Sequence, residues 1–287
     1  MKRPLHTSGD PLPYETASTT SNRPGRGIFT LRRIEVGRHC EVNQLVWRGW
    51  GVLLLVVVAC GVQAKDTPKS DGPANAATQQ VHDEAVRILT SLQSTKYQHD
   101  TEIDEQTGVY LCDCSGFVGY VLNRTMAKGD PTKGPFGNGR KRPLAMDYEK
   151  GFAAAPAKTE KSDKAARWQQ VVRLMDARPG DVIAWRHEKP MPGNTGHVVI
   201  VDQKPVVEES GLVRVVVIDS TTKPQVDDTR AAGTSGIGRG TMWFNVDKDG
   251  HAISYLRGSR TAKPKTEAIS IGRALPTTEK PAARRAA

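Results

Sequence analysis

The sequence predicts an α+β domain in which helices near its amino end pack on an antiparallel sheet formed later in the chain. Apolar side chains recur at helical spacing in two early segments, 76–95 and 114–125. β-Branched residues then dominate two later runs, "GHVVIVDQK" and "LVRVVVIDS", which the turn-forming stretch "EESG" separates. Helices that precede strands, rather than alternating with them, are typical of α+β domains.

The two early helices differ in how well their ends are marked. The first places four apolar side chains near one face, those of Val81, Ala85, Leu89 and Leu92. The second has the spacing Phe117, Val118, Val121 and Leu122, and Asp113 or Cys114 stands where its N-cap is expected.

Weaker elements complete the predicted domain. "PLAMDYEKGFAAA" predicts a short helix, and "WQQVVRLMDARPGD" a short helix or turn that leads into the strand "DVIAWRH". "GTMWFNVDKDGHAISYLRG" predicts another hairpin, which turns at Asp249-Gly250. Polar segments at 127–142 and 154–167 are expected to be loops.

The first 64 residues are expected to form a leader with a signal peptide. Its apolar core, residues 51–62, is too short for a membrane span, which needs about 20 residues. Cleavage after Ala64 and lipidation at Cys60, in the lipobox-like "VVAC", are alternative processing routes, and a buried core helix is a third interpretation. Residues 65–75 then form a linker, 76–260 the folded domain, and 261–287 a basic low-complexity tail.

Export would leave the protein in the periplasm, or anchored to the outer membrane as a lipoprotein if Cys60 is lipidated. Cys112 and Cys114 are then the cysteines left to the domain. A disulfide between positions i and i+2 closes a strained loop, so no disulfide framework is expected.

The net charge of +10 is unevenly distributed along the chain. Residues 65–262 hold 27 Lys and Arg against 25 Asp and Glu, so the predicted domain is nearly neutral. A nucleic-acid partner would require a basic folded face, so none is expected. The basic tail either contacts an anionic surface or only adds solubility.

Cys114 is the candidate nucleophile. A helix N-terminus favours the thiolate over the thiol, and its free amides can hold an oxyanion. Gly116 would let the backbone approach a substrate closely. Cys112 precedes the helix, and one Cys-x-Cys pair without a second pair is a poor metal signature, so neither a metal nor another cofactor is expected.

A thiol nucleophile needs a base, and the base needs a residue that orients it. His197 is the candidate base because it begins a predicted strand next to a flexible loop. A hairpin turn centred at Glu208 would place Asp219 opposite His197. Asp202 is the rival carboxylate, but it lies five residues along the same strand, about 16 Å away in an extended chain.

Three motifs in this order resemble the NlpC-type cell-wall cysteine peptidases, which have a papain-like fold. The resemblance covers about residues 75–255. The matching residues are Asp113, Cys114, Ser115 and Gly116, then Pro179, Gly180 and Asp181, then Gly196 and His197. It implies Cys114 as nucleophile, His197 as base, and a substrate cleft formed by Tyr110, Asp113, Ser115 and Gly196. The chain departs from the family at the third catalytic residue, commonly His there and Asp219 here.

The resemblance implies an exported thiol hydrolase that cuts stem peptides of peptidoglycan. Amidases and acyltransferases share this machinery, so an enzyme acting on another amide or ester is the first alternative. A non-catalytic binding or scaffold protein with the same fold is the second.

Overall fold

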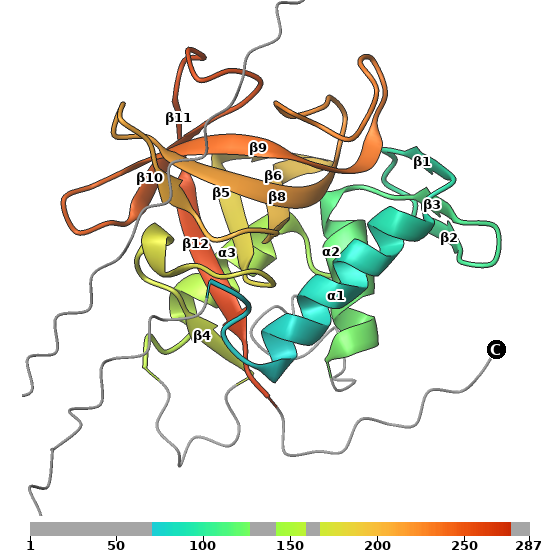
Figure 1. Ribbon diagram of the computed structural model, residues 1–287, viewed down its shortest axis with the longest axis horizontal. Coiled ribbons are helices and arrows are strands. Elements are labelled where there is room, and N and C mark those ends of the chain that lie inside the picture. Colours follow the sequence, from blue (N-terminus) through green and yellow to red (C-terminus); the bar gives the residue numbers. More distant parts are fainter. Residues whose placement is uncertain (1–70, 127–141, 159–166, 277–287) are drawn as a thin grey trace, which may run out of the picture. The chain divides into compact units, whose positions relative to one another are not determined.

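The computed structural model describes residues 71–126, 142–158 and 167–276 (Figure 1). Every described residue belongs to one compact unit. The predicted leader, with Cys60 and both processing sites, lies outside the described residues. So do the linker up to residue 70, most of the two predicted loops and the end of the predicted tail.

Three α-helices occupy the positions that the sequence predicts. They are α1 (Ala76–Ser91), α2 (Cys114–Thr125) and α3 (Ala145–Ala154). Asn75 caps α1, accepting hydrogen bonds from the amides of Ala77 and Thr78, and α1 ends four residues before the predicted limit. A short 3₁₀ turn follows at Leu174–Asp176. No helix within the described ranges is long and apolar enough to cross a membrane.

Two sheets complete the domain. The small sheet has the order β1 (Ser94–Lys96), β3 (Val109–Leu111), β2 (Glu102–Asp104). The large sheet has the order β11-β10-β9-β8-β6-β5-β12-β4, with β7 also paired to β8, and each of its strand pairs is antiparallel. Its strands are β4 (Trp168–Gln170), β5 (Val182–Met191), β6 (Asn194–Val201), β7 (Val206–Val207), β8 (Val213–Thr221), β9 (Gly236–Val246), β10 (Ala252–Leu256), β11 (Lys265–Thr266) and β12 (Ala268–Ala274). The predicted α+β class with an antiparallel sheet is confirmed.

The large sheet buries side chains on both of its faces. Val182 and Ala184 of β5 join the cluster beneath the helices, whereas Ile183 and Trp185 join a second cluster on the opposite face. Alternate residues of a strand point to opposite faces, so a strand buried on both sides is apolar throughout. This explains the unbroken β-branched runs in the sequence.

The prediction that residues 261–287 form a low-complexity tail is wrong for the part that the structure describes. β12 lies between β5 and β4, and Ile271 and Ala274 are buried in the core. Arg273 donates two hydrogen bonds to the buried carboxylate of Asp181, at 3.0 and 2.8 Å. One seven-residue strand among Lys, Pro and Ala gives little periodic signal, and its stability comes from pairing with two neighbours. The folded domain therefore continues past residue 260.

The predicted hairpin register between β6 and β8 is wrong by two residues. The observed pairs are Ile200–Ile218 and Val201–Val217. When this register is extended along the strands, position 197 lies opposite position 221. The chain adds the short strand β7 before it turns at 208–211, which lengthens the connection. Because side chains alternate with a period of two, an even shift keeps the same faces together. His197 therefore stays on the same face as Asp219, its diagonal neighbour.

Candidate active site

Cys114 is the first residue of α2, and Asp113 is the N-cap. The Asp113 backbone is extended, and its Oδ1 accepts a hydrogen bond of 2.7 Å from the amide of Gly116. The Asp113 carbonyl accepts from Phe117 at 2.9 Å. Among the described residues this leaves the amides of Cys114 and Ser115 available at the helix end, where the backbone favours negative charge.

His197 lies between Cys114 and Asp219. Its Nε2 is 2.8 Å from Asp219 Oδ2, so its Nδ1 is the nitrogen left to interact with the Cys114 thiol. The imidazole packs against the Trp185 ring, with 5.1 Å between centroids. The carboxylate, the imidazole and the thiol thus form a connected row from β8 across β6 to α2.

The pKa values of His197 and Asp219 are set by their close neighbours. Burial alone would lower the pKa of His197, but the charge and hydrogen bonds of Cys114 and Asp219 raise it to about 9. Burial would raise the pKa of Asp219, but the hydrogen bond from His197 and the charge of Arg230 lower it to about 2. The structure therefore favours an imidazolium beside an ionised carboxylate at neutral pH.

A pocket of about 190 Å³ opens beside Cys114. It is lined by Tyr97, His99, Asp113, Cys114, Ser115, Arg142, Leu144, Ala145, Gly193, Thr195 and Gly196. Three of the four residues expected at a substrate cleft are among them: Asp113, Ser115 and Gly196. At Gly196 the backbone has φ of +145°, and a Cβ would lie 1.9 Å from the Trp185 carbonyl oxygen, so only glycine fits this wall of the pocket.

The fourth expected residue, Tyr110, is not at the pocket, and this expectation is wrong. Tyr110 is fully buried in the core, where its ring meets that of Tyr120 edge to face. Tyr97 lines the pocket instead. Burial raises the pKa of Tyr97, and the neighbouring Cys114 raises it further through its charge and a hydrogen bond. Tyr110 alternates with residues that face outwards on a short strand, whereas Tyr97 follows β1 and turns towards α2.

Arg142 forms the charged wall of the pocket, and no pattern in the sequence indicated it. Its guanidinium donates to Asp113 Oδ2 at 2.8 Å and to the His99 carbonyl at 3.0 Å, and it also contacts the Ser115 hydroxyl. Burial would raise the pKa of Asp113, but Arg142 keeps it below its usual value. The carboxylate and the guanidinium give the pocket both charge signs.

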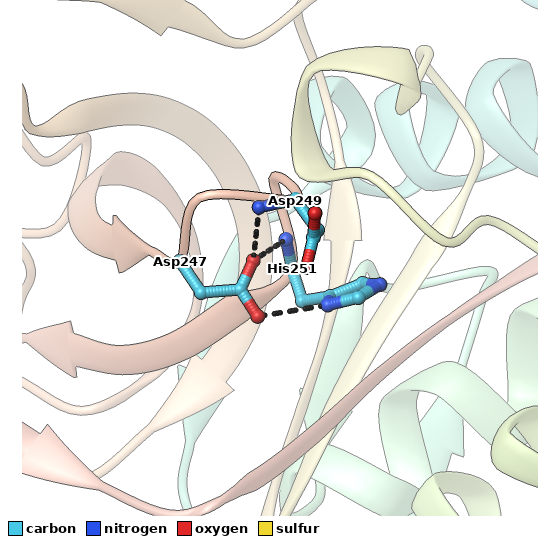
Figure 2. A group of neighbouring side chains, drawn as sticks. All are labelled: Asp247, Asp249 and His251. Atoms are coloured by element: carbon cyan, nitrogen blue, oxygen red, sulfur yellow. Dashed lines mark hydrogen bonds and ion pairs between the residues drawn. The ribbon is translucent and has the colours of Figure 1, made fainter.

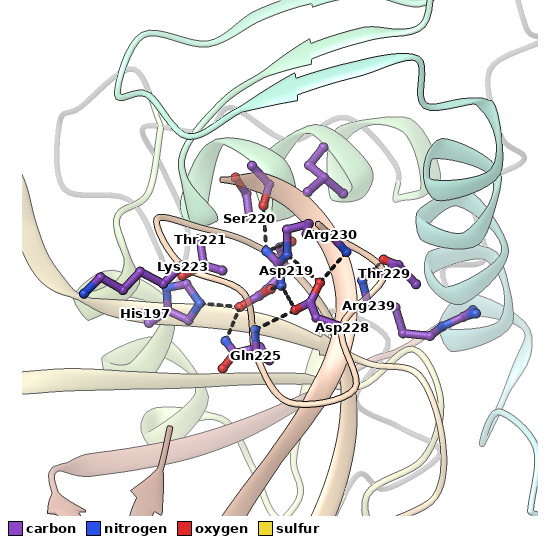
Figure 3. Close-up of polar contacts among 12 residues, drawn as sticks. His197, Asp219, Ser220, Thr221, Lys223, Gln225, Asp228, Thr229, Arg230 and Arg239 are labelled. Atoms are coloured by element: carbon purple, nitrogen blue, oxygen red, sulfur yellow. Dashed lines mark hydrogen bonds and ion pairs between the residues drawn. The ribbon is translucent and has the colours of Figure 1, made fainter. Parts of the chain in front are cut away.

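Arg230 and Gln225 are further residues that the sequence did not single out. Gln225 Nε2 donates to Asp219 Oδ2 at 2.9 Å, and an Arg230 nitrogen donates to Asp219 Oδ1 at 2.8 Å (Figure 3). Both belong to the polar loop between β8 and β9, which has no hydrophobic period. One sequence pattern could have pointed to Arg230: it lies two residues after Asp228, a spacing that allows a local ion pair.

Cys112 lies apart from this arrangement. It is fully buried, and burial together with the charge of Asp113 raises the pKa of its thiol to about 12. Its carbonyl accepts a hydrogen bond of 2.6 Å from Ser220. Both cysteines in the described part of the chain are free thiols, and the placement of Cys112 is that of an unreactive core residue.

One group of side chains within the described residues has the composition of a metal site. Asp247, Asp249 and His251 lie together on the hairpin between β9 and β10 (Figure 2). Asp247 Oδ1 accepts from the amides of Asp249 and His251, both at 2.9 Å, and Oδ2 faces His251 Nδ1 at 2.8 Å. These contacts close the hairpin turn and account for both oxygens of Asp247.

The row of carboxylate, imidazole and thiol can in principle form and hydrolyse an acyl-enzyme, because it combines a nucleophile, a base and a group that orients the base. This interpretation depends on the contact between His197 and Asp219 and on the effect of Cys114 on the pKa of His197. Comparison of the chain with family models, with curated proteins and with solved structures finds no match.

Proposed function

We propose that the protein is a thiol hydrolase of amide bonds in which Cys114 is the nucleophile. One observation carries the proposal. The Cys114 thiol at the N-terminus of α2 interacts with His197, whose other nitrogen is held by the buried carboxylate of Asp219. A thiol next to a buried imidazole that a carboxylate orients is the arrangement that activates a nucleophile, whereas an isolated surface histidine and an isolated core cysteine would not do so.

The reaction would proceed in two steps. The Cys114 thiolate adds to the carbonyl carbon, and the imidazolium of His197 gives its proton to the leaving amine as the C–N bond breaks, which leaves a thioester. Water then adds to the thioester while His197 takes its proton, and the thiolate leaves with release of the acid. The amides of Cys114 and Ser115, with the Tyr97 hydroxyl, are the donors available to the oxyanion.

We infer further that the domain has the papain-like arrangement of the NlpC-type peptidases. The support is the position of the three motifs. Asp113–Gly116 begins α2, Pro179–Asp181 immediately precedes β5, and Gly196–His197 lies in β6, which pairs with β5. Asp219 in place of the more common histidine is the main departure.

The substrate that fits this proposal is a stem peptide of peptidoglycan. The pocket carries a carboxylate at Asp113 and a guanidinium at Arg142, which suit a short peptide with charges of both signs. Export to the periplasm, through cleavage after Ala64 or lipidation at Cys60, would bring the enzyme to that polymer. Contact of the basic carboxyl-terminal residues with an anionic surface belongs to the same proposal.

A digest of purified peptidoglycan, analysed by mass spectrometry, tests the proposal. The wild-type protein should release stem-peptide fragments, Cys114→Ser should release none, and Cys112→Ser should act nearly as the wild type. Products cut between glycan and peptide would indicate an amidase. No products, together with a Cys114 that iodoacetamide alkylates no faster than a free thiol, would indicate a scaffold protein. Equal losses in both cysteine variants would contradict the assignment of Cys114.

A further inference from the structure

We infer that Arg230 is a positioning residue, which orients the His197 imidazole by fixing the carboxylate of Asp219. The inference extends the proposed function and rests on it for its catalytic meaning. Arg230 contacts neither the thiol nor the residues that line the pocket, so it would act on the site indirectly, mainly through Asp219. Figure 3 shows it reaching the carboxylate from the loop that connects β8 and β9.

The Arg230 guanidinium is buried, and each of its three nitrogens donates hydrogen bonds. Its side chain is 2% exposed. One terminal nitrogen bonds both Asp219 Oδ1, at 2.8 Å, and Asp228 Oδ2, at 2.6 Å, while Nε donates to Asp228 Oδ1 at 2.8 Å. The other terminal nitrogen donates to the Gly236 carbonyl at 2.7 Å. A buried arginine with planar donors in fixed directions holds its carboxylate partners in one orientation.

These contacts decide which way the Asp219 carboxylate points. Oδ1 is taken by Arg230, so Oδ2 is the oxygen left for His197 Nε2 and Gln225 Nε2. The groups that face this carboxylate are therefore His197 from β6 and Gln225 and Arg230 from the loop. Arg230 also offsets the charge of two buried carboxylates, which would otherwise repel one another.

Strand β9 is built to accommodate this guanidinium. Gly238 and Gly240 are two residues apart, on one face of the strand. A Cβ at Gly238 would lie 2.5 Å from Arg230 Nε, and a Cβ at Gly240 would lie 2.6 Å from Asp228 Oδ2. The stretch "GIGRG" thus leaves room for the ion pair to lie flat on the strand.

The same loop supports the other side of the pocket. Gly236, whose carbonyl accepts from Arg230, packs so closely on β1 that a Cβ would lie 2.3 Å from Thr95 Oγ1. Ser235 Oγ accepts a hydrogen bond of 3.2 Å from the amide of Tyr97. Arg230 therefore connects the segment that holds Tyr97 to the carboxylate that holds His197.

The test compares Arg230→Met and Arg230→Lys with the control Arg239→Met. Arg239 lies on β9 and pairs with a different buried carboxylate, Asp202, so its removal breaks an arginine–aspartate pair away from Asp219, although its side chain is 36% exposed and that of Arg230 2%. The first readout is the ¹⁵N spectrum of His197, which reports the proton on Nε2. The second is the pH profile of iodoacetamide alkylation at Cys114, followed by peptide mapping.

In Arg230→Met we expect the Nε2–H signal of His197 to move away from the chemical shift of a hydrogen-bonded N–H group. Without Arg230 the carboxylate of Asp219 binds a proton more readily, and its support of the imidazolium is lost as the pH falls. The acidic limb of the alkylation profile should therefore move to higher pH, with a rate at pH 6 about tenfold below the wild type, a loss typical of removing a group that orients a functional side chain. Arg230→Lys should recover only part of the rate, because lysine keeps the charge but lacks the planar donors, and Arg239→Met should stay within about twofold.

A wild-type His197 spectrum in Arg230→Met would overturn the inference, as would equal shifts in Arg230→Met and Arg239→Met. If Arg230→Met does not fold, Gly238→Ala provides the same test, because its Cβ displaces the guanidinium without removing it. The proposed function fails separately, when wild-type Cys114 is no more reactive than a free thiol. The spectrum of His197 still decides the role of Arg230 in that case.

Discussion

The domain contains two clusters of identical composition, each a buried aspartate that binds one histidine and one arginine. The first consists of Asp219, His197 and Arg230, and the second of Asp202, His82 and Arg239. The histidine–carboxylate distances are similar, 2.8 Å in the first and 3.1 Å in the second. Composition alone therefore does not distinguish the cluster that is proposed to be catalytic from the other one.

The two clusters differ in what the second nitrogen of the histidine meets. Cys114 is the neighbour of His197 beyond its bond to Asp219, whereas His82 Nδ1 lies 3.9 Å from Asp83, an exposed residue of the same helix. The second cluster joins α1 to the sheet, because His82 belongs to α1 and Asp202 follows β6. The two clusters therefore differ in whether the fold places a thiol next to the histidine, and the proposed catalysis depends on that difference.

The largest expected effect separates the two histidines. His197→Ala should lower hydrolysis about 10⁴-fold, because it removes the proton acceptor and the partner of the thiolate. His82→Ala should leave the rate per folded molecule within about twofold and should lower the melting temperature. Rates on a peptide substrate, with folded protein measured by circular dichroism, decide the outcome. Comparable losses in rate would show that the two clusters are not distinct in function.

The two carboxylates provide the next contrast. An asparagine at position 219 must turn its NH₂ away from Arg230, which cannot lose its protons, and so towards Nε2 of His197. The imidazole then takes the wrong tautomer, and activity should fall about 10³-fold. Asp202→Asn should leave activity nearly unchanged. If Asp219→Asn keeps more than a tenth of the wild-type rate, Asp219 does not set the tautomer.

The pH dependence of the melting temperature should show the contribution of His197 to stability. Because the pKa of His197 is raised to about 9, its stabilising contribution is complete below the unfolded value of about 6.5 and is lost as the pH rises through 9. Hydrolysis, which needs the imidazolium to protonate the leaving amine, should fall over the same alkaline limb. Melting temperatures from pH 6 to 10 should therefore decline less in His197→Ala than in the wild type.

The smallest expected effect is that of Gln225→Leu. Gln225 donates a second hydrogen bond to Asp219 Oδ2, and its own Oε1 has no partner among the described residues. Loss of one such bond should reduce activity roughly two- to fivefold. A loss as large as that of Asp219→Asn, seen in the kcat of a peptide substrate, would mean that Gln225 and not Arg230 fixes the carboxylate.

The sequence predicted those parts of the structure that depend on local patterns. The second helix was predicted with its observed bounds, Cys114–Thr125, because its cap and its apolar spacing agree. His197 and Asp219 could be paired because His197 begins one β-branched run and Asp219 ends the next, although the register was wrong by two. Arg230, Tyr97 and β12 could not be predicted, because their places are determined by contacts between segments far apart in the chain.

The position of β12 constrains the order in which the molecule can fold during synthesis. β12 pairs with β5, the strand that carries Trp185 beneath His197, and its Ala274 carbonyl accepts a hydrogen bond of 3.0 Å from Asn75 at the start of α1. The sheet therefore has a gap next to β5 until residue 274 has left the ribosome. A growing chain can form its helices and hairpins earlier, but β12 can pair with β5 only after these elements have been synthesised. The surroundings of His197 are thus completed only after β12 has been synthesised.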